Sequence, residues 1–258
     1  MSETEPLLLR EQRDGVAWLT LNRPGQRNAL SIPLMTALET ALEEVAEDRT
    51  VKAVVIAGAG PALCAGHDLR EVRGADAAMH QRLFAQCSRL MQRILGLPVP
   101  VIARVHGVAT AAGCQLVATC DLAIAAESAR FATPGVNIGL FCSTPMVALS
   151  RAVGRKAAME MLLTGEMIGA AEAARLGLIN RAVPEAELDE AVGSLARQIA
   201  GKSRKVLALG KPAFYCQAEL PLAEAYAYTS EVMVRNMQEA DAAEGIDAFL
   251  QKRKPVWA

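Results

Sequence analysis

Two stretches decide the fold of this 258-residue chain: PALCAGHDL, residues 61–69, and VHGVATAAGCQL, residues 105–116. The first follows a run that reads as a buried strand, and the second leads from a strand into a helix. Both are rich in small residues, which let a ligand approach the main chain closely. The same small residues are equally consistent with tight helix packing alone.

The two stretches could together form an anion site. One main-chain N–H group from each could converge on a single oxygen, and the helix start would add the positive end of its dipole. Such a pair suits a thioester oxygen that becomes negative when the neighbouring carbon is deprotonated or attacked.

Outward from these stretches, the sequence predicts an α/β core. Asp14-Gly15 favours a hairpin turn, and Ser31 can cap a helix that runs to about Asp48. Apolar residues spaced by three and four predict an amphipathic helix over 79–95. Strand-like runs stand at 16–21, 51–57, 101–105, 121–126, 131–132 and 179–183.

The second half of the chain is mostly helix-compatible. A helix from about Leu222 to Phe249 is expected near the C-terminus. No repeat, low-complexity tract or linker divides the chain, so the sequence predicts an α/β core followed by a helical part.

Composition argues against several classes of protein. The 27 basic and 28 acidic residues nearly cancel, which disfavours a nucleic-acid-binding or membrane-surface protein. The longest apolar run, Val108 to Cys120, is too short to span a bilayer. The six cysteines lack a framework spacing, and the three histidines lack metal-ligand spacing. Reduced thiols and no metal site are therefore expected.

The start of the chain bears on location. Residues 1–6 are acidic, without the basic, apolar start of a signal peptide or the arginine-rich character of a transit peptide. Together with reduced thiols, this start predicts a soluble, cytoplasmic protein.

Two glycine motifs suggest nucleotide binding but lack its other features. GAG at residues 58–60 follows a strand, yet Leu63 stands where a dinucleotide fingerprint has its third glycine. GKS at residues 201–203 ends like a P-loop, but Ala196 replaces the earlier glycine. A nicotinamide enzyme is therefore disfavoured.

Several motifs, taken in their order, resemble those of a known superfamily. They are LNRP (21–24), NAL (28–30), CAGHDL (64–69), the run from His106 to Asp121, FATP (131–134), RAVG (151–154) and AAEAARLGLI (170–179). The chain is similar to the crotonase, or enoyl-CoA hydratase/isomerase, superfamily from about Val16 to the C-terminal helices. Residues 131–148 look most like the branch called enoyl-CoA hydratase domain-containing protein 3.

The resemblance implies a fold and an assembly. The fold would be of the α/β class, a crotonase-type spiral of ββα units with a helical C-terminal trimerisation part. Residues 1–200 would form the core with the CoA and acyl site, and residues 201–258 the oligomerisation part. A homotrimer, commonly paired into a hexamer, is implied. The apolar fraction of 52% fits surface buried between subunits.

The resemblance also implies site residues. The family's oxyanion hole uses main-chain N–H groups that map to Ala65 and Ala112, with Gly113 as an alternative donor. The two glutamates of the family's hydratases map to Gln115 and Gly135. Glutamine cannot take a proton from water and glycine has no side chain, so enoyl-CoA hydration is predicted to be weak or absent.

Two residues are candidate substitutes for the missing carboxylates. His67 could titrate near neutrality, although it could equally face the CoA chain or solvent. Ser143 lies near the acyl pocket by the resemblance.

Further residues are candidates for binding CoA. Arg27 could meet a phosphate or be an ordinary exposed loop arginine, and Asp68 could instead cap the segment after it. The adenine and pantetheine are expected along a segment comprising Ala62, Leu63, Cys64, Gly66, Asp68 and Leu69. Coenzyme A would enter as part of the substrate, and no permanently bound cofactor is expected.

Two kinds of function follow from these residues. One is an acyl-CoA enzyme of shifted chemistry, such as an isomerase, hydrolase, decarboxylase or weak hydratase. The other is a non-catalytic acyl-CoA-binding or assembly protein, which the missing carboxylates favour.

Overall fold

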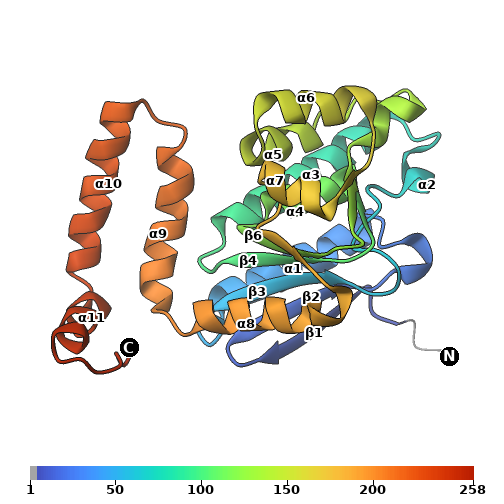
Figure 1. Cartoon of the computed structure of the whole chain (residues 1–258). Helices are drawn as coiled ribbons and strands as arrows, with labels where there is room; N and C mark the ends of the chain where they lie inside the picture. Colours follow the sequence, from blue (N-terminus) through green and yellow to red (C-terminus); the bar gives the residue numbers. More distant parts are fainter. Residues whose placement is uncertain (1–4) are drawn as a thin grey trace.

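The sheet at the centre of the molecule begins with a hairpin (Figure 1). The computed structural model describes residues 5–258, so most of the acidic start used above to predict the location lies outside it. β1 (Leu8–Arg13) and β2 (Val16–Leu21) pair antiparallel. Between them Asp14 has φ 53° and Gly15 φ 73°. Because a two-residue hairpin turn needs such left-handed residues, the predicted turn is confirmed.

Parallel strands extend the sheet from β2. The strand order is β1-β2-β3-β4-β6-β9, and every pair after the hairpin is parallel. Parallel pairs need crossover connections, which the intervening helices provide. The added strands are β3 (Ala53–Gly58), β4 (Val101–Val105), β6 (Leu122–Ala126) and β9 (Arg181–Val183). A smaller sheet, in the order β5-β7-β8, contains β5 (Val108–Thr110), β7 (Arg130–Ala132) and β8 (Ile168–Gly169).

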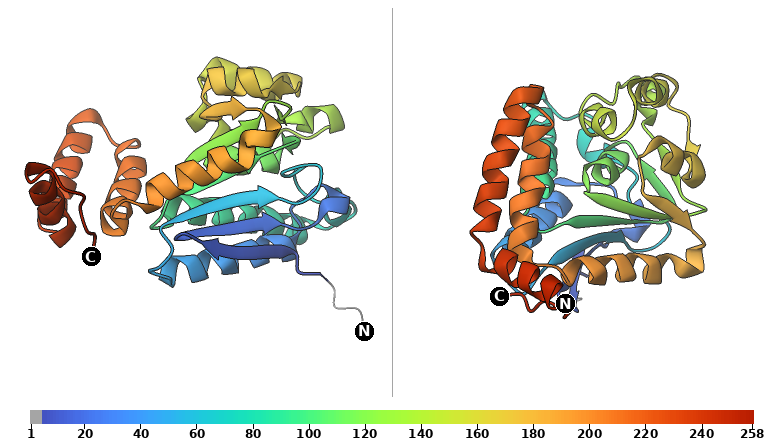
Figure 2. Two further views of the ribbon diagram at one scale, coloured as in Figure 1. Left: turned by 60° about the horizontal axis from the view of Figure 1, so that its bottom comes forward. Right: turned by 60° about the vertical axis from the view of Figure 1, so that its left-hand side comes forward.

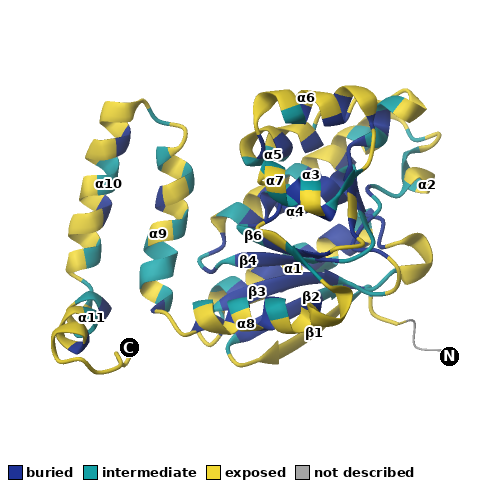
Figure 3. Ribbon diagram, in the orientation of Figure 1, coloured by how far each residue is buried: buried dark blue, intermediate teal, exposed yellow. Residues whose placement is uncertain are grey.

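Helices bury both faces of the large sheet. Successive residues of a strand point to opposite faces, so Val16 and Trp18 of β2 pack with α8 (Leu188–Ala200). Leu19 of β2 belongs instead to the cluster that includes α1 (Ile32–Glu47) and α3 (Ala77–Gly96). The central strands β2, β3, β4 and β6 are accordingly almost wholly buried, whereas the edge strand β1 is exposed (Figure 3).

Side-chain caps begin the two long helices of the core, α1 and α3. Ser31 Oγ accepts the N–H of Leu34 at 3.3 Å and Asp76 accepts that of Met79 at 2.8 Å, which satisfies N–H groups that have no helical partner. The predicted cap of α1 is confirmed. The remaining elements of the core are η1 (Pro24–Gln26), α2 (Leu69–Val72), α4 (Ala112–Thr119), η2 (Pro134–Ile138), α5 (Pro145–Ala152), α6 (Arg155–Thr164), α7 (Ala170–Leu176) and η3 (Glu185–Glu187).

The last helices stand beside the core and are largely exposed (Figures 1, 2 and 3). They are α9 (Arg204–Gln217), α10 (Leu222–Met237) and α11 (Ala240–Leu250). The prediction of one helix over 222–249 is therefore wrong. Glu239 adopts an extended conformation at ψ 141° that ends the helical path, and Asp241 then accepts the main-chain N–H of Ala258 at 2.8 Å. This contact with the end of the chain lies just past the break.

A buried ion pair joins α9 to the core. Lys211 Nζ lies 2.7 Å from the Asp121 carboxylate and donates to the carbonyls of Ile94 and Val99 at 2.8 and 3.0 Å. Asp121 also accepts the Tyr215 hydroxyl at 2.8 Å and the main-chain N–H of Val101 at 2.7 Å. Burial lowers the pKa of Lys211 and raises that of Tyr215.

Within residues 5–258, no helix is both long and apolar enough to cross a membrane. The same part of the chain gathers no group of three or more side chains suited to holding a metal ion.

Candidate functional site

The two glycine- and alanine-rich stretches lie against each other. Cys64 donates its N–H to the Val108 carbonyl at 3.2 Å and accepts that of Thr110 at 3.0 Å. A Cβ on Gly113 would lie 2.1 Å from the Cys64 carbonyl oxygen, and Gly66 has φ 101°. Glycine is therefore required at both positions, and the small residues serve close backbone packing.

The structure changes one of the two predicted donors. The N–H of Ala65 donates to the Arg27 carbonyl at 3.0 Å. This N–H is therefore not free to bind an oxyanion, and the prediction of Ala65 as a donor is corrected. The N–H groups of His67 and Ala112 have no acceptor among residues 5–258. A Cβ on Gly66 would lie 3.7 Å from the Ala112 nitrogen, which places that N–H beside the first stretch. His67 and Ala112 therefore replace Ala65 and Ala112 as the candidate pair.

Gly113 also has a free N–H within the described chain. Its Cα faces the Cys64 carbonyl at very close range. Ala112 is the better placed of the two.

The residue before Ala112 holds a strained conformation. Ala111 has φ 49° and ψ −116°, a region that costs a residue with a side chain roughly 1–3 kcal/mol. Its N–H donates to the Ala132 carbonyl at 2.9 Å and its carbonyl accepts the Gln115 N–H at 3.0 Å. These bonds hold the turn that starts α4.

A cavity of about 520 Å³ is lined by His67 and by Ala111, the residue before Ala112; we call it the smaller cavity. Of the predicted site residues, it is lined by Ala65, His67, Asp68, Leu69 and Gly135. The structure does not bring the following predicted residues to its lining: Arg27, Ala62, Leu63, Cys64, Gly66, Ala112, Gly113, Gln115 and Ser143.

Part of the predicted CoA segment is inaccessible. Ala62, Leu63 and Cys64 are wholly buried, and Leu63 donates its N–H to the His106 carbonyl at 3.0 Å. CoA therefore has no access to the side chains of these three residues, and the N–H groups of Leu63 and Cys64 are already bonded within the chain. The prediction is corrected for these groups.

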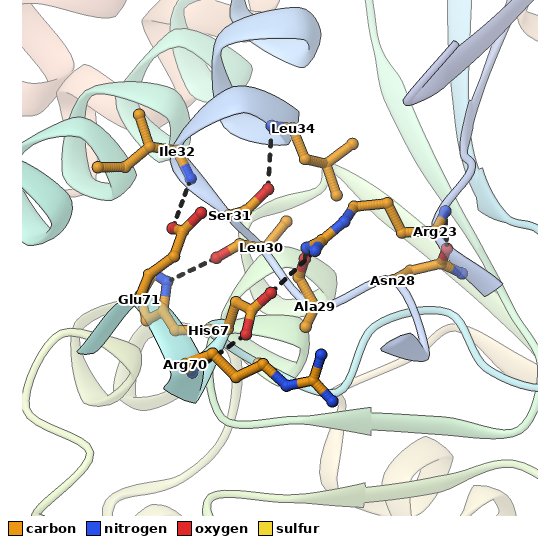
Figure 4. A network of polar contacts seen from close by, with 12 residues as sticks. Arg23, Asn28, Ala29, Leu30, Ser31, Ile32, Leu34, His67, Arg70 and Glu71 are labelled. Atoms are coloured by element: carbon orange, nitrogen blue, oxygen red, sulfur yellow. Dashed lines mark hydrogen bonds and ion pairs between the residues drawn. The ribbon is translucent and has the colours of Figure 1, made fainter. Parts of the chain in front are cut away.

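His67 lies in the wall of the smaller cavity with its ring held by packing. Its Nδ1 is 3.4 Å from the Leu30 carbonyl (Figure 4), and the ring meets Phe84 edge to face at 5.6 Å. Nε2 is buried without a partner in the described chain. Burial lowers the pKa of His67, so the ring is neutral at physiological pH.

A polar network fixes the segment that carries His67 (Figure 4). Arg23 lies 2.8 Å from the Asp68 carboxylate and keeps its pKa below the ordinary value. Asp68 also accepts the N–H of Arg70 at 3.1 Å, which confirms its capping role. Glu71 accepts the N–H of Ile32 at 2.9 Å. This network joins the start of α2 to the start of α1.

Sequence reasoning missed Arg70. Its side chain is exposed at the wall of the smaller cavity, whereas Arg27 is exposed outside the lining. The signal was present, since Arg70 directly follows the CAGHDL motif.

Gln115 and Gly135 border different cavities. Gln115 lines a larger cavity of about 720 Å³ between α3, α4, α5 and α9. It is 4% exposed, and its Oε1 lies 3.8 Å from the Cys87 thiol that donates to it. Burial raises the pKa of Cys87 to about 12, so the thiol stays protonated as the donor.

Gly135 has no room for a side chain. A Cβ there would lie 2.5 Å from the Leu140 carbonyl oxygen and 2.9 Å from Cys142 Sγ. Ser143 is exposed and donates its hydroxyl to the Phe141 carbonyl at 3.3 Å. It lines neither cavity, so its predicted place near the ligand is not supported.

The winding of parallel strands with crossover helices, the second small sheet and the helical C-terminal part define the crotonase fold. The chain belongs to the enoyl-CoA hydratase/isomerase family, which it matches over residues 11–258. The predicted fold class and superfamily are confirmed.

Several individual proteins resemble this chain over nearly its whole length. Enoyl-CoA hydratase domain-containing protein 3 of Rattus norvegicus, named as mitochondrial, is 50% identical over 99% of this chain and 86% of its own. The crystal structure of the human protein of that name has a TM-score of 0.95 at 49% identity, covering 98% of this chain and 100% of that one. An enoyl-CoA hydratase from Mycobacterium smegmatis has a TM-score of 0.96 at 53% identity, covering 98% and 99%. The branch resemblance of residues 131–148 is confirmed.

The predicted cytoplasmic location is overturned by these relatives. The rat, mouse and human proteins, at 49–50% identity, are all named as mitochondrial. The prediction rested on the composition of residues 1–6 and on the expectation of reduced thiols, and neither distinguishes the cytosol from the mitochondrial compartment named for the relatives.

Proposed function

We propose that the chain binds acyl-CoA thioesters in the smaller cavity, with the thioester oxygen between the N–H groups of His67 and Ala112. The supporting observation is that both groups lack an acceptor in the described chain and come from two stretches packed backbone to backbone. Preorganised donors of this kind each stabilise a developing oxyanion by about 3 kcal/mol. The names of the relatives, enoyl-CoA hydratases, agree with such a ligand.

The proposed chemistry stops short of ordinary hydration. Hydration requires a group that takes a proton from water and one that delivers a proton to the α-carbon. At the corresponding positions, Gln115 offers only a neutral amide and Gly135 only backbone. We therefore propose enolate stabilisation with weak or absent enoyl-CoA hydration.

A second candidate is a non-catalytic acyl-CoA-binding protein. It is favoured by the Leu140 carbonyl, which fills the space that a side chain at 135 would need. Against it stands the pair of N–H groups at His67 and Ala112, which have no acceptor in the described chain and could stabilise an enolate.

The proposed CoA phosphate ligands are Arg70 and Arg27. Arg70 lines the smaller cavity, as do Gly25 and Gln26 immediately before Arg27. The exposed Arg70 guanidinium in the lining, with Arg27 next in sequence to lining residues, suits a phosphate, which arginine binds with paired N–H donors.

Butyryl-CoA is expected to bind about tenfold more tightly than butyl-CoA, the thioether that lacks the carbonyl oxygen. The two ligands differ only in the atom that the N–H pair would contact, and two net hydrogen bonds are worth roughly that ratio. Titration calorimetry measures both affinities, and free CoA serves as the reference for the CoA part that the two ligands share. Equal affinities of the ester and the thioether would remove the oxyanion hole from the proposal.

We also propose that residues 201–258 assemble the protein into a trimer or hexamer around the core at 1–200. Large apolar side chains are exposed on the last three helices, and such patches mark interfaces. They include Phe214, Leu222, Tyr226, Met233, Val234, Met237, Phe249 and Leu250.

Light scattering of the purified chain at micromolar concentration should give the mass of three or six subunits. Substituting Met233 and Val234 together by glutamate should lower that mass, because two charges would be buried at the interface. A monomeric wild type would contradict the proposed assembly.

A further inference from the structure

A chain of hydrogen bonds leads from the Arg23 side chain to the N–H of His67. The guanidinium Nη1 of Arg23 donates to the Ala29 carbonyl at 2.7 Å (Figure 4). The same peptide group ends in the N–H of Leu30, which donates to the Gly66 carbonyl at 2.7 Å. The Gly66 carbonyl in turn shares its peptide group with the N–H of His67, the candidate oxyanion donor.

These contacts fix the direction of the donor. A peptide group is planar, and no peptide bond within residues 5–258 is cis, so the C=O and N–H of one group point in opposite directions. Because the Gly66 carbonyl is bound by the Leu30 N–H, the N–H of His67 points away from Leu30. A hydrogen bond weakens steeply as its angle closes, so a rotation of this peptide group would remove the donor.

The backbone at Gly66 does not hold this direction by itself. Gly66 has φ 101°, and glycine adopts many conformations at little cost. Bonds on either side of it supply the support. The N–H of Ala65 donates to the Arg27 carbonyl at 3.0 Å, and the N–H of Asp68 donates to the Leu30 carbonyl at 3.2 Å. The stretch 65–68 is therefore held by the segment 23–30.

Arg23 binds both of these segments. Besides the Ala29 carbonyl, its guanidinium lies 2.8 Å from the Asp68 carboxylate, and the two charged side chains are only 17% and 11% exposed. Arg23 belongs to the lining of neither cavity, so its influence on a ligand passes through the peptide groups. Hydrogen bonds in such a chain polarise one another, and a cation at the far end strengthens the effect.

We infer that Arg23 is a positioning residue of the oxyanion hole: through the peptide groups 29–30 and 66–67, its guanidinium orients and polarises the N–H of His67. Asp68 keeps the guanidinium at the Ala29 carbonyl. This inference rests on the proposed function, in which the N–H of His67 meets the thioester oxygen.

Arg23→Met tests the inference, because methionine keeps an unbranched side chain and has no donor. The wild type is expected to prefer butyryl-CoA to butyl-CoA about tenfold. If the donor at His67 is lost, the bond from Ala112 remains, and the preference should fall to about threefold. The affinity for butyl-CoA, which lacks the carbonyl oxygen, should stay within about twofold of wild type. Titration calorimetry of the assembled protein measures both ligands.

The infrared band of the bound thioester carbonyl gives a second measurement. Butyryl-CoA carrying ¹³C at this carbonyl separates its band from those of the protein, and hydrogen bonds to the oxygen lower its frequency. Arg23→Met should lower the frequency less than the wild type does. Arg23→Lys keeps a cation but not the planar fork that binds two acceptors, so its preference and its band should lie between the two.

Arg204→Met is the matched control. Arg204 is partly buried and donates to the carbonyls of Val51 and Ala46 at 2.9 and 3.1 Å, and it lines neither cavity. The same substitution there should lower the unfolding midpoint and leave the ligand preference and the carbonyl band as in the wild type.

The outcomes separate the two proposals. If the wild type binds butyryl-CoA and butyl-CoA equally, the proposed function fails. If the wild type prefers the ester and both Arg23 variants keep the full preference and the wild-type band, only the inference is overturned. An equal loss of affinity for the two ligands in Arg23→Met would overturn it as well, because Arg23 would then support the fold and not the donor. If Arg23→Met does not fold, the same comparison with Arg23→Lys decides.

Discussion

Crotonyl-CoA hydration by the purified protein is expected to be orders of magnitude slower than by an ordinary hydratase. A positioned acid or base contributes about two to four orders of magnitude, and Gln115 and Gly135 provide neither. The loss of ultraviolet absorbance of the conjugated enoyl thioester measures the rate. A wild-type turnover of roughly hundreds per second, within the common range for enzymes, would show that these two positions are misinterpreted.

The geometry at Gly135 limits how this expectation can be tested by restoring carboxylates. Gln115→Glu retains the shape of the side chain, whereas any Cβ at 135 meets the Leu140 carbonyl oxygen at 2.5 Å. Because the two groups act as a unit, Gln115→Glu alone should raise the rate little. Gln115→Glu with Gly135→Glu should raise it only if residues 140–142 move aside.

Two controls accompany these variants. Gly135→Ala shows whether the backbone accepts any side chain at 135, through its unfolding midpoint. Gln12→Glu adds a carboxylate on the exposed face of β1 and should leave the rate unchanged.

Asp121→Ala is expected to lower the free energy of unfolding by about 3–5 kcal/mol, because removing one partner leaves a buried charge uncompensated. The side chains of Lys211 and Asp121 are only 6% and 15% exposed. The N–H of Val101 and the hydroxyl of Tyr215 would also lose their acceptor. Urea unfolding at a fixed protein concentration measures the change.

An exposed ion pair supplies the matched control. Glu172 and Arg175 pair on the surface of α7 with side chains 41% and 69% exposed. Glu172→Gln should cost less than about 1 kcal/mol, as exposed pairs generally do. If Asp121→Ala proved equally mild, the pair would not anchor α9.

Local signals predicted much of the fold. The Asp14-Gly15 turn and the Ser31 cap depend on a few neighbouring residues, and the structure has both. The sequence did not predict the break at Glu239, beside which Asp241 binds the chain end at Ala258. The pattern of residues within 222–249 carries no information about that contact.

The candidate site was predicted in outline and missed in detail. The motifs identified the two stretches, but which N–H groups remain free depends on partners elsewhere in the chain. Ala65 is lost as a donor because the Arg27 carbonyl lies opposite it. The separation of Gln115 and Gly135 into two cavities likewise depends on how α4 packs.

The order of strands also governs how this chain can fold. β6 pairs with β9 across the whole of α5 to α7, and such distant pairs form slowly because long loops must close first. α9 can dock only after the end of α3 and the start of β6 are in place, since Lys211 binds Ile94 and Asp121. During synthesis, the apolar surfaces of the last helices are therefore the last to find cover, and they are where premature association would begin.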